Sequence, residues 1–144
     1  MKNKIKIFVI FTLIVTVGFL TVSCSSVEPA PPPVNTSLDG IWSRGDIVIT
    51  ISGSSAIFTE ISPDTNWHRV QNIGQISIGD TKFRDITPDG DLRWTAQDLT
   101  FNNDSYRISG WQNAIITMDT DGLSIHVSTG GGVSNPENTY LRVR

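Results

Sequence analysis

The sequence predicts an all-β protein, a single small antiparallel up-and-down β-barrel of about eight to ten short strands. Apolar and polar residues alternate with a period of two in several segments, which is typical of half-buried strands. Turn-forming residues separate these segments at intervals of about 8–12 residues, as in barrels and sandwiches. No window shows the 3.6-residue period of an amphipathic helix, so we expect no long helix.

Two β-hairpins are the clearest elements of this pattern. In the first, the small polar turn at residues 52–55 joins two alternating runs, residues 47–51 and 56–61. In the second, the turn Asp119-Thr-Asp-Gly122 joins two runs whose apolar members are Ala114, Ile116, Met118, Leu123, Ile125 and Val127. A four-residue turn that ends in Gly is a favoured hairpin connection, so we expect local antiparallel pairing at both places.

The other strands are predicted from shorter segments between turn signals. The candidates between the two hairpins are residues 67–73, 75–78, 82–86, 92–96 and 106–109. The last strand is expected at residues 139–143, after a loop of small residues, 128–136, that we expect to be long and flexible. No internal repeat is expected, because no matching sequence surrounds the four tryptophans, Trp42, Trp67, Trp94 and Trp111.

The amino-terminal segment has the anatomy of an export signal. Three lysines within the first six residues precede an apolar run, residues 7–22, and Ser23 leads to the only cysteine, Cys24. The end of this segment resembles the lipobox of bacterial lipoproteins, which implies cleavage after residue 23, a lipid on Cys24 and anchoring to a membrane of the cell envelope. A plain secretory peptide and a retained helix are the alternatives. The uncharged run is shorter than the roughly 20 residues of a membrane span, which disfavours the helix.

A proline-rich linker is expected between the lipid and the folded domain. Residues 24–38 contain Pro29 and the run of prolines at 31–33, which favour an extended polyproline II backbone. The 13 residues between Cys24 and Leu38 reach up to ~40 Å at about 3.1 Å per residue, which would hold the domain clear of the lipid headgroups. The predicted organisation is therefore a signal peptide at residues 1–23, a lipidated linker at 24–38 and a barrel domain at 39–144.

Charge and cysteine content exclude several classes of function. Removal of residues 1–23 takes away three lysines and no acidic residue, so the formal net charge changes from −3 to −6. An acidic chain without a Lys or Arg cluster is not expected to bind nucleic acid. With Cys24 acylated no thiol remains, which excludes disulfides, thiolate metal sites and cysteine catalysis.

The start of the domain resembles a known barrel family. The segment Leu38-Asp-Gly-Ile-Trp42 is similar to the Gly-x-Trp start of lipocalin-like barrels, in which the Trp closes the narrow end and the last strand pairs back near it. The same resemblance implies an Arg packed on Trp42, for which Arg142 and Arg144 are the candidates. The domain as a whole also resembles small bacterial lipoproteins, and that resemblance brings no activity with it.

Candidate catalytic and metal-binding residues are few. His68 lies near Asp64 in sequence, but no nucleophile motif accompanies this pair, so we expect no catalytic site and no enzyme activity. Two separated histidines make a zinc site improbable, and His126 alternates with apolar neighbours and is expected to face solvent. The Asp119-Thr-Asp-Gly122 segment has the start of a calcium loop without the distal Glu, and we interpret it as a turn. No metal and no cofactor are expected.

Aromatic residues near amides are the remaining candidates for binding. Trp67, Trp111 and Asn113 are candidate ligand contacts, because exposed Trp beside Asn or Asp is a surface that can hold sugars. Packing in the core or at the rim is the alternative for each Trp. The sequence therefore predicts a membrane-anchored envelope lipoprotein that is a non-enzymatic binding or structural module for a small apolar ligand, a glycan or an envelope protein. The alternative is an envelope enzyme or enzyme-inhibitor domain that uses loop carboxylates or His68.

Overall fold

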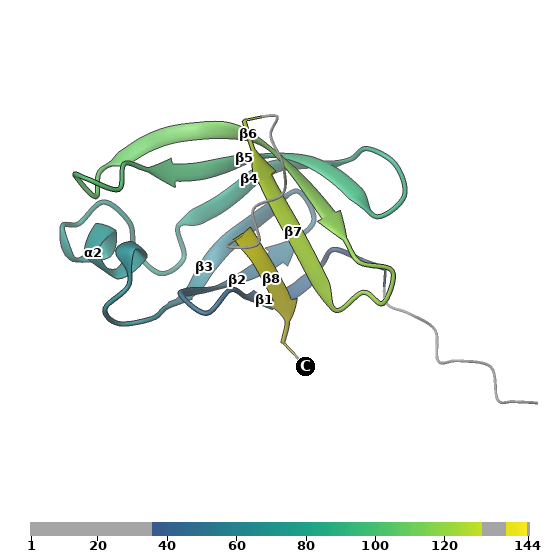
Figure 1. The fold of residues 1–144 in the computed structure, drawn as a ribbon, viewed down its shortest axis with the longest axis horizontal. Coiled ribbons are helices and arrows are strands. Elements are labelled where there is room, and N and C mark those ends of the chain that lie inside the picture. Colours follow the sequence, from purple (N-terminus) through teal and green to yellow (C-terminus); the bar gives the residue numbers. More distant parts are fainter. Residues whose placement is uncertain (1–35, 131–137, 144) are drawn as a thin grey trace, which may run out of the picture. The chain divides into compact units, whose positions relative to one another are not determined.

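A computed structural model describes residues 36–130 and 138–143. In this part of the chain eight strands form one closed antiparallel barrel, in which each strand pairs with the next and the last pairs back with the first (Figure 1). The strands are β1 (Gly40–Ser43), β2 (Ile47–Ser52), β3 (Ser55–Ile61), β4 (Thr81–Pro88), β5 (Arg93–Phe101), β6 (Ile108–Met118), β7 (Ser124–Thr129) and β8 (Thr139–Arg142). The predicted all-β up-and-down barrel is confirmed. The predicted signal peptide, Cys24, most of the predicted linker and residues 131–136 of the predicted loop lie outside the described residues, and the first two residues of that loop, 128 and 129, belong to β7.

Both predicted hairpins are present with the expected alternation. Strands β2 and β3 pair through a turn that contains Gly53 at a φ of 59°, a conformation in which Gly is unstrained. Strands β6 and β7 pair from Ala114 opposite Thr129 to Met118 opposite Ile125. Leu123 belongs to the connecting turn rather than to β7, which starts one residue later.

Two of the predicted strands between the hairpins are wrong. Residues 67–73 fall largely within a short helix, α2 (Asn66–Asn72), and residues 75–78 form an irregular connection to β4. The Thr65 side chain caps α2 by accepting a hydrogen bond from the backbone N–H of His68 at 3.2 Å. Trp67 and Val70 are three positions apart, so a single turn of helix buries both on one face. The apolar spacing that we interpreted as a strand fits this helical face instead.

The interior of the barrel is filled with apolar side chains. They form one cluster in which the largest fully buried members are Trp42, Tyr140, Phe58, Phe83, Ile47, Ile49, Ile51, Ile116, Ile125, Val70 and Val127. In β2 and β7 alternate residues supply this core, which is the pattern that a period of two produces in a closed barrel. The described residues include no cysteine and so no disulfide. The burial of this apolar cluster is therefore the main favourable contribution to the free energy of folding.

Trp42 and Arg142 close the end of the barrel at which the described chain begins. The Trp42 ring is fully buried, and its indole N–H donates to the Leu38 carbonyl at 2.9 Å. The Arg142 guanidinium stacks on this ring, 4.2 Å from its centroid, and donates to the carbonyls of Gly122 and Asp39 at 2.8 and 3.0 Å. This is the arrangement that the lipocalin-like resemblance implies, and Arg142 is the arginine that provides it.

Gly40 allows Arg142 to approach β1. Its φ is +144°, and a Cβ atom at this position would lie 2.9 Å from Arg142 Nη1. We expect Gly40→Ala to lower the free energy of unfolding by about 1–3 kcal/mol, measured by urea denaturation, because both the backbone and the contact are strained. Gly45→Ala is the matched control, since Gly45 also has a positive φ, +88°, but no atom within 4 Å of its Cβ position. Equal losses in the two variants would show that the contact with Arg142 contributes nothing.

Candidate functional site

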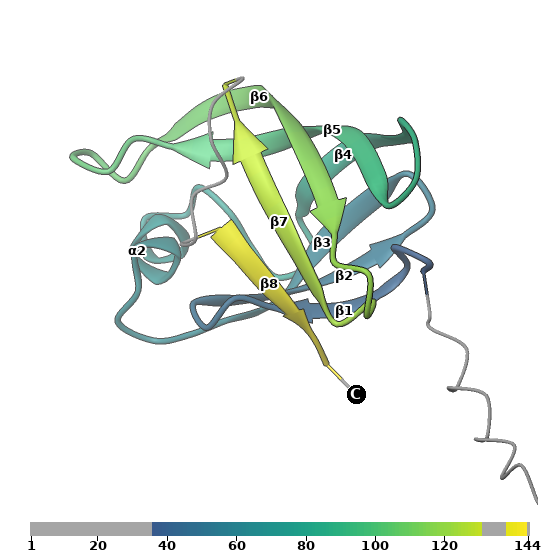
Figure 2. The same cartoon turned by 45° about the vertical axis from the view of Figure 1, so that its right-hand side comes forward.

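A polar pocket of about 490 Å³ lies at the other end of the barrel. In an up-and-down barrel alternate connections meet at one end, and here the β1–β2, β3–β4 and β5–β6 connections do so, beside the end of β7 and the start of β8. The start of the described chain and α2 lie at opposite ends of the barrel (Figures 1 and 2). We call this cavity the open-end pocket. Its charged lining residues are Arg44, Asp46, Lys82 and Asp98, and its other lining residues are Asn66, Trp67, Leu99, Thr100, Phe101, Asn103, Thr129 and Asn138.

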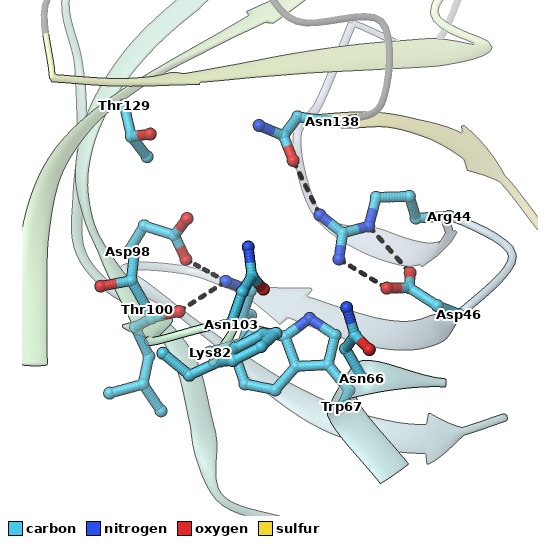
Figure 3. Close-up of a pocket in the computed structure, with 12 residues that line it drawn as sticks. Arg44, Asp46, Asn66, Trp67, Lys82, Asp98, Thr100, Asn103, Thr129 and Asn138 are labelled. Atoms are coloured by element: carbon cyan, nitrogen blue, oxygen red, sulfur yellow. Dashed lines mark hydrogen bonds and ion pairs between the residues drawn. The ribbon is translucent and has the colours of Figure 1, made fainter. Parts of the chain in front are cut away.

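A buried ion pair lies in the wall of the open-end pocket. Lys82 Nζ donates to Asp98 Oδ1 and, at 2.7 Å, to the Leu99 carbonyl (Figure 3). The two side chains are only 3% and 10% exposed. Burial lowers the pKa of Lys82 and raises the pKa of Asp98, and the attraction between the two groups opposes both shifts. The charged form of each side chain is therefore stabilised in the barrel wall by the opposite charge of the other.

A second ion pair lies across the pocket. Arg44 binds Asp46 through two parallel hydrogen bonds of 2.8 Å, and its third nitrogen donates to Asn138 Oδ1, also at 2.8 Å (Figure 3). The guanidinium also lies 5.2 Å from the centroid of Tyr140, whose pKa is raised chiefly by burial. Arg44 thus joins the β1–β2 turn to the residue before β8, 94 positions away in the sequence.

Trp67 presents its nitrogen edge to the pocket. Its ring is 3% exposed and packs between Phe58 and Phe101, with centroids 5.0 and 4.6 Å away, while Lys82 Nζ lies 4.7 Å from the ring centroid. Figure 3 shows the indole nitrogen turned toward the space between the two ion pairs. This N–H has no hydrogen-bond partner among the described residues. In the same residues every fully buried side-chain nitrogen or oxygen has a partner, so the indole nitrogen is not fully buried. The indole N–H is therefore accessible from the pocket.

The predicted contacts do not lie on one surface. Trp67 lines the open-end pocket, whereas Trp111 and Asn113 lie on the outer face of β6, out of phase with the buried Ala114 and Ile116. The Arg84 guanidinium covers the Trp111 ring at 4.2 Å. Asn113 accepts a hydrogen bond from Gln97 and lines a second, outer depression of about 620 Å³, formed by residues of β4 to β7. The three candidates thus belong to two separate surfaces.

The histidines lie outside the open-end pocket. His68 is on α2, and its Nδ1 accepts the backbone N–H of Asp64 at 3.2 Å. His126 is on the outer face of β7, between Thr139 at 2.9 Å and Asp119 at 3.2 Å. The pKa of Asp119 is lowered mainly by the hydrogen bond that Ser124 donates to its carboxylate. The contact with His126 lowers this pKa further.

The turn interpretation of residues 119–122 is confirmed. The Asp119 N–H donates to the Ser124 carbonyl at 3.0 Å, and the Gly122 N–H donates to the Asp119 carbonyl at 2.9 Å. Within residues 36–130 and 138–143, no three His, Cys, Asp or Glu residues are grouped as metal ligands. No helix in the same residues is both long enough and apolar enough to cross a bilayer.

Of the residues that line the open-end pocket, sequence reasoning singled out only Trp67 as a candidate contact, and it missed the pairing residues Arg44, Asp46, Lys82 and Asn138. The sequence holds one signal for Lys82, because a charged residue within a predicted strand is a candidate for an ion pair. Its partner Asp98 is 16 positions away, however, and only the strand register brings the two side chains together. Comparisons with protein-family models, with curated proteins and with solved structures find no match. The function is therefore argued from the geometry of the pocket.

Proposed function

We propose that this protein is a lipid-anchored protein of the bacterial cell envelope whose barrel is a non-enzymatic binding module for a small polar ligand. The observation that carries this proposal is the open-end pocket, a cavity of about 490 Å³ at one end of a closed barrel. Ligand pockets in proteins commonly have volumes of about 300–1,000 Å³. The barrel provides a rigid frame on which loops and one short helix position the polar groups.

The position of the pocket fits an anchored binding protein. The described chain starts beside the closed end, where Arg142 donates to the carbonyls of Ser37 and Asp39 at 2.5 and 3.0 Å. Helix α2, which carries the pocket residues Asn66 and Trp67, lies at the opposite end of the barrel (Figure 1). An anchor that reaches the domain through residues 24–38 therefore leaves the mouth of the pocket free to face away from the membrane.

The lining of the pocket favours binding of a polar ligand over the other candidates. Large apolar side chains occupy the interior, which disfavours an apolar ligand inside the barrel. The formal charge of the chain after removal of residues 1–23, −6, disfavours nucleic acid. An enzyme that uses His68 is disfavoured because His68 lies outside the pocket, and the two carboxylates of the pocket are each paired with a cation. The proposal therefore assigns binding, not catalysis, to these residues.

The anchor is tested by metabolic labelling. We expect a clickable fatty acid to label the full chain in bacterial cells and the labelled protein to fractionate with membranes. Cys24→Ala removes the thiol that carries the lipid, so its label should fall to background and its membrane fraction should fall with it. Ser26→Ala, which keeps Cys24, is the matched control and should label like the wild type. Equal labelling of wild type and Cys24→Ala would contradict the anchor.

A further inference from the structure

We propose that the open-end pocket binds an uncharged ligand rich in hydroxyl groups, that is, a neutral sugar or short glycan. This inference rests on the proposed function and names the class of ligand for the same site. It is argued from three properties of the described residues: the balanced charge of the pocket, its unpaired hydrogen-bonding groups and its apolar wall.

The charges of the pocket are paired within the pocket itself. Arg44 has Asp46 as its partner, and Lys82 has Asp98 and the Leu99 carbonyl. An anionic ligand would have to displace a carboxylate from Arg44 or Lys82, and a cationic ligand would have to displace a cation from Asp46 or Asp98. Breaking a buried or bidentate pair is unfavourable, so the site discriminates against charged ligands. A neutral ligand can bind beside both pairs without separating either.

Several hydrogen-bonding groups of the pocket remain unused. The Trp67 indole N–H, the amides of Asn66 and Asn103 and the Thr129 hydroxyl form no side-chain hydrogen bond with another described residue. The indole offers only a donor, whereas amides and hydroxyls offer both donors and acceptors. A sugar hydroxyl also donates and accepts, so neighbouring hydroxyls on one ring can bind several of these groups at once. An apolar ligand would leave the same groups without partners, which is unfavourable.

One wall of the pocket is apolar. Phe101, which is only partly buried, lines it beside Trp67. Leu99 lines the pocket with its carbonyl, because its side chain faces outward with its register partner Trp111. The C–H face of a sugar ring packs on such a surface while its hydroxyls point to the polar wall. Because the Trp67 ring is 3% exposed, its role is to donate the indole N–H rather than to stack on the ligand.

The test uses the full lipidated chain, purified in detergent, on an array of neutral and acidic glycans, with a fluorescent fatty acid as a separate ligand. The dissociation constant of the best ligand is then measured by titration calorimetry for the wild type and the pocket variants Trp67→Phe and Asn103→Ala. Trp67→Phe keeps an aromatic ring and removes the N–H. Trp111→Phe and Asn113→Ala, on the outer face of β6, are the matched controls.

We expect a neutral glycan to bind, with each pocket variant binding about 5-fold more weakly, as for the loss of one hydrogen bond, and each control binding like the wild type. Asn103 is exposed, so Asn103→Ala keeps the test valid if Trp67→Phe does not fold. Preference for an acidic glycan or the fatty acid, or sensitivity only to the outer-face variants, would overturn the inference and leave the proposed binding function standing. Binding of no ligand in any arm would overturn both.

Discussion

Trp42→Ala is expected to destabilise the barrel by about 3–5 kcal/mol, a large fraction of the roughly 5–15 kcal/mol by which a small domain is stable. The ring is fully buried at the closed end, its N–H donates to the Leu38 carbonyl and Arg142 stacks on its face. The substitution leaves a cavity, an unpaired carbonyl and an arginine without its ring. Chemical denaturation of the full chain, followed by far-UV circular dichroism, measures the loss.

Trp111→Ala is the matched control for this prediction. Trp111 lies on the outer face of β6, partly buried under Arg84, so its removal opens no cavity in the core. Its ring also packs from outside against the apolar cluster, so we expect a loss of about 1–2 kcal/mol, clearly smaller than that of Trp42→Ala. A denaturation midpoint for Trp42→Ala equal to that of the wild type would contradict the assignment of Trp42 as the closing residue of the barrel.

The barrel could be predicted from sequence because its strands are defined by local alternation. Ile47, Ile49 and Ile51 alternate with partly exposed residues, and they are buried as predicted. The Gly-x-Trp segment placed Trp42 at the closed end on only two matching residues, Gly40 and Trp42, yet the predicted contact with an arginine is present.

Helix α2 was missed because it is short and its signals are weak. It has seven residues, and only Trp67 and Val70 mark its buried face. The Thr65 cap was the signal that could have identified it, since Thr is a favoured N-cap residue. Without that cap, two apolar residues three positions apart are compatible with either element.

The open-end pocket could not be predicted because its residues are scattered along the chain. Arg44 and Asn138 meet only when β8 closes on β1, and Lys82 meets Asp98 only through the register of β4 and β5. Pairing of this kind depends on the closure of the whole barrel, which no local pattern specifies. Of the three predicted contacts, Trp67 lines this pocket, and a ligand contact at Trp67, Trp111 or Asn113 stays a prediction.

The buried pair in the pocket gives the second large effect. We expect Lys82→Met alone, or Asp98→Leu alone, to lower the free energy of unfolding by about 3–5 kcal/mol, because each leaves an unpaired charge in the barrel wall. The double variant Lys82→Met/Asp98→Leu removes both charges and should lie within about 1 kcal/mol of the wild type. Denaturation of the four proteins in a double-mutant cycle measures the coupling between the two residues. Additive losses in the double variant would show that the pair is not coupled.

The free energies of unfolding of the two single variants should change with pH in opposite directions. In Lys82→Met, burial raises the pKa of Asp98 and only the weaker attraction of Arg44 opposes this shift, so the folded state binds more protons than the unfolded state and stability decreases as pH rises. In Asp98→Leu, burial and the charge of Arg44 lower the pKa of Lys82 and only the weaker attraction of Asp46 opposes this shift, so the unfolded state binds more protons and stability increases as pH rises. Denaturation at about pH 5, 7 and 9 brackets the range between the ordinary pKa values of Asp and Lys. The deficit of Lys82→Met, relative to the wild type, should be smallest at pH 5, and that of Asp98→Leu smallest at pH 9. Deficits that are the same at all three values would mean that neither charge is buried in the barrel wall as the structure places it.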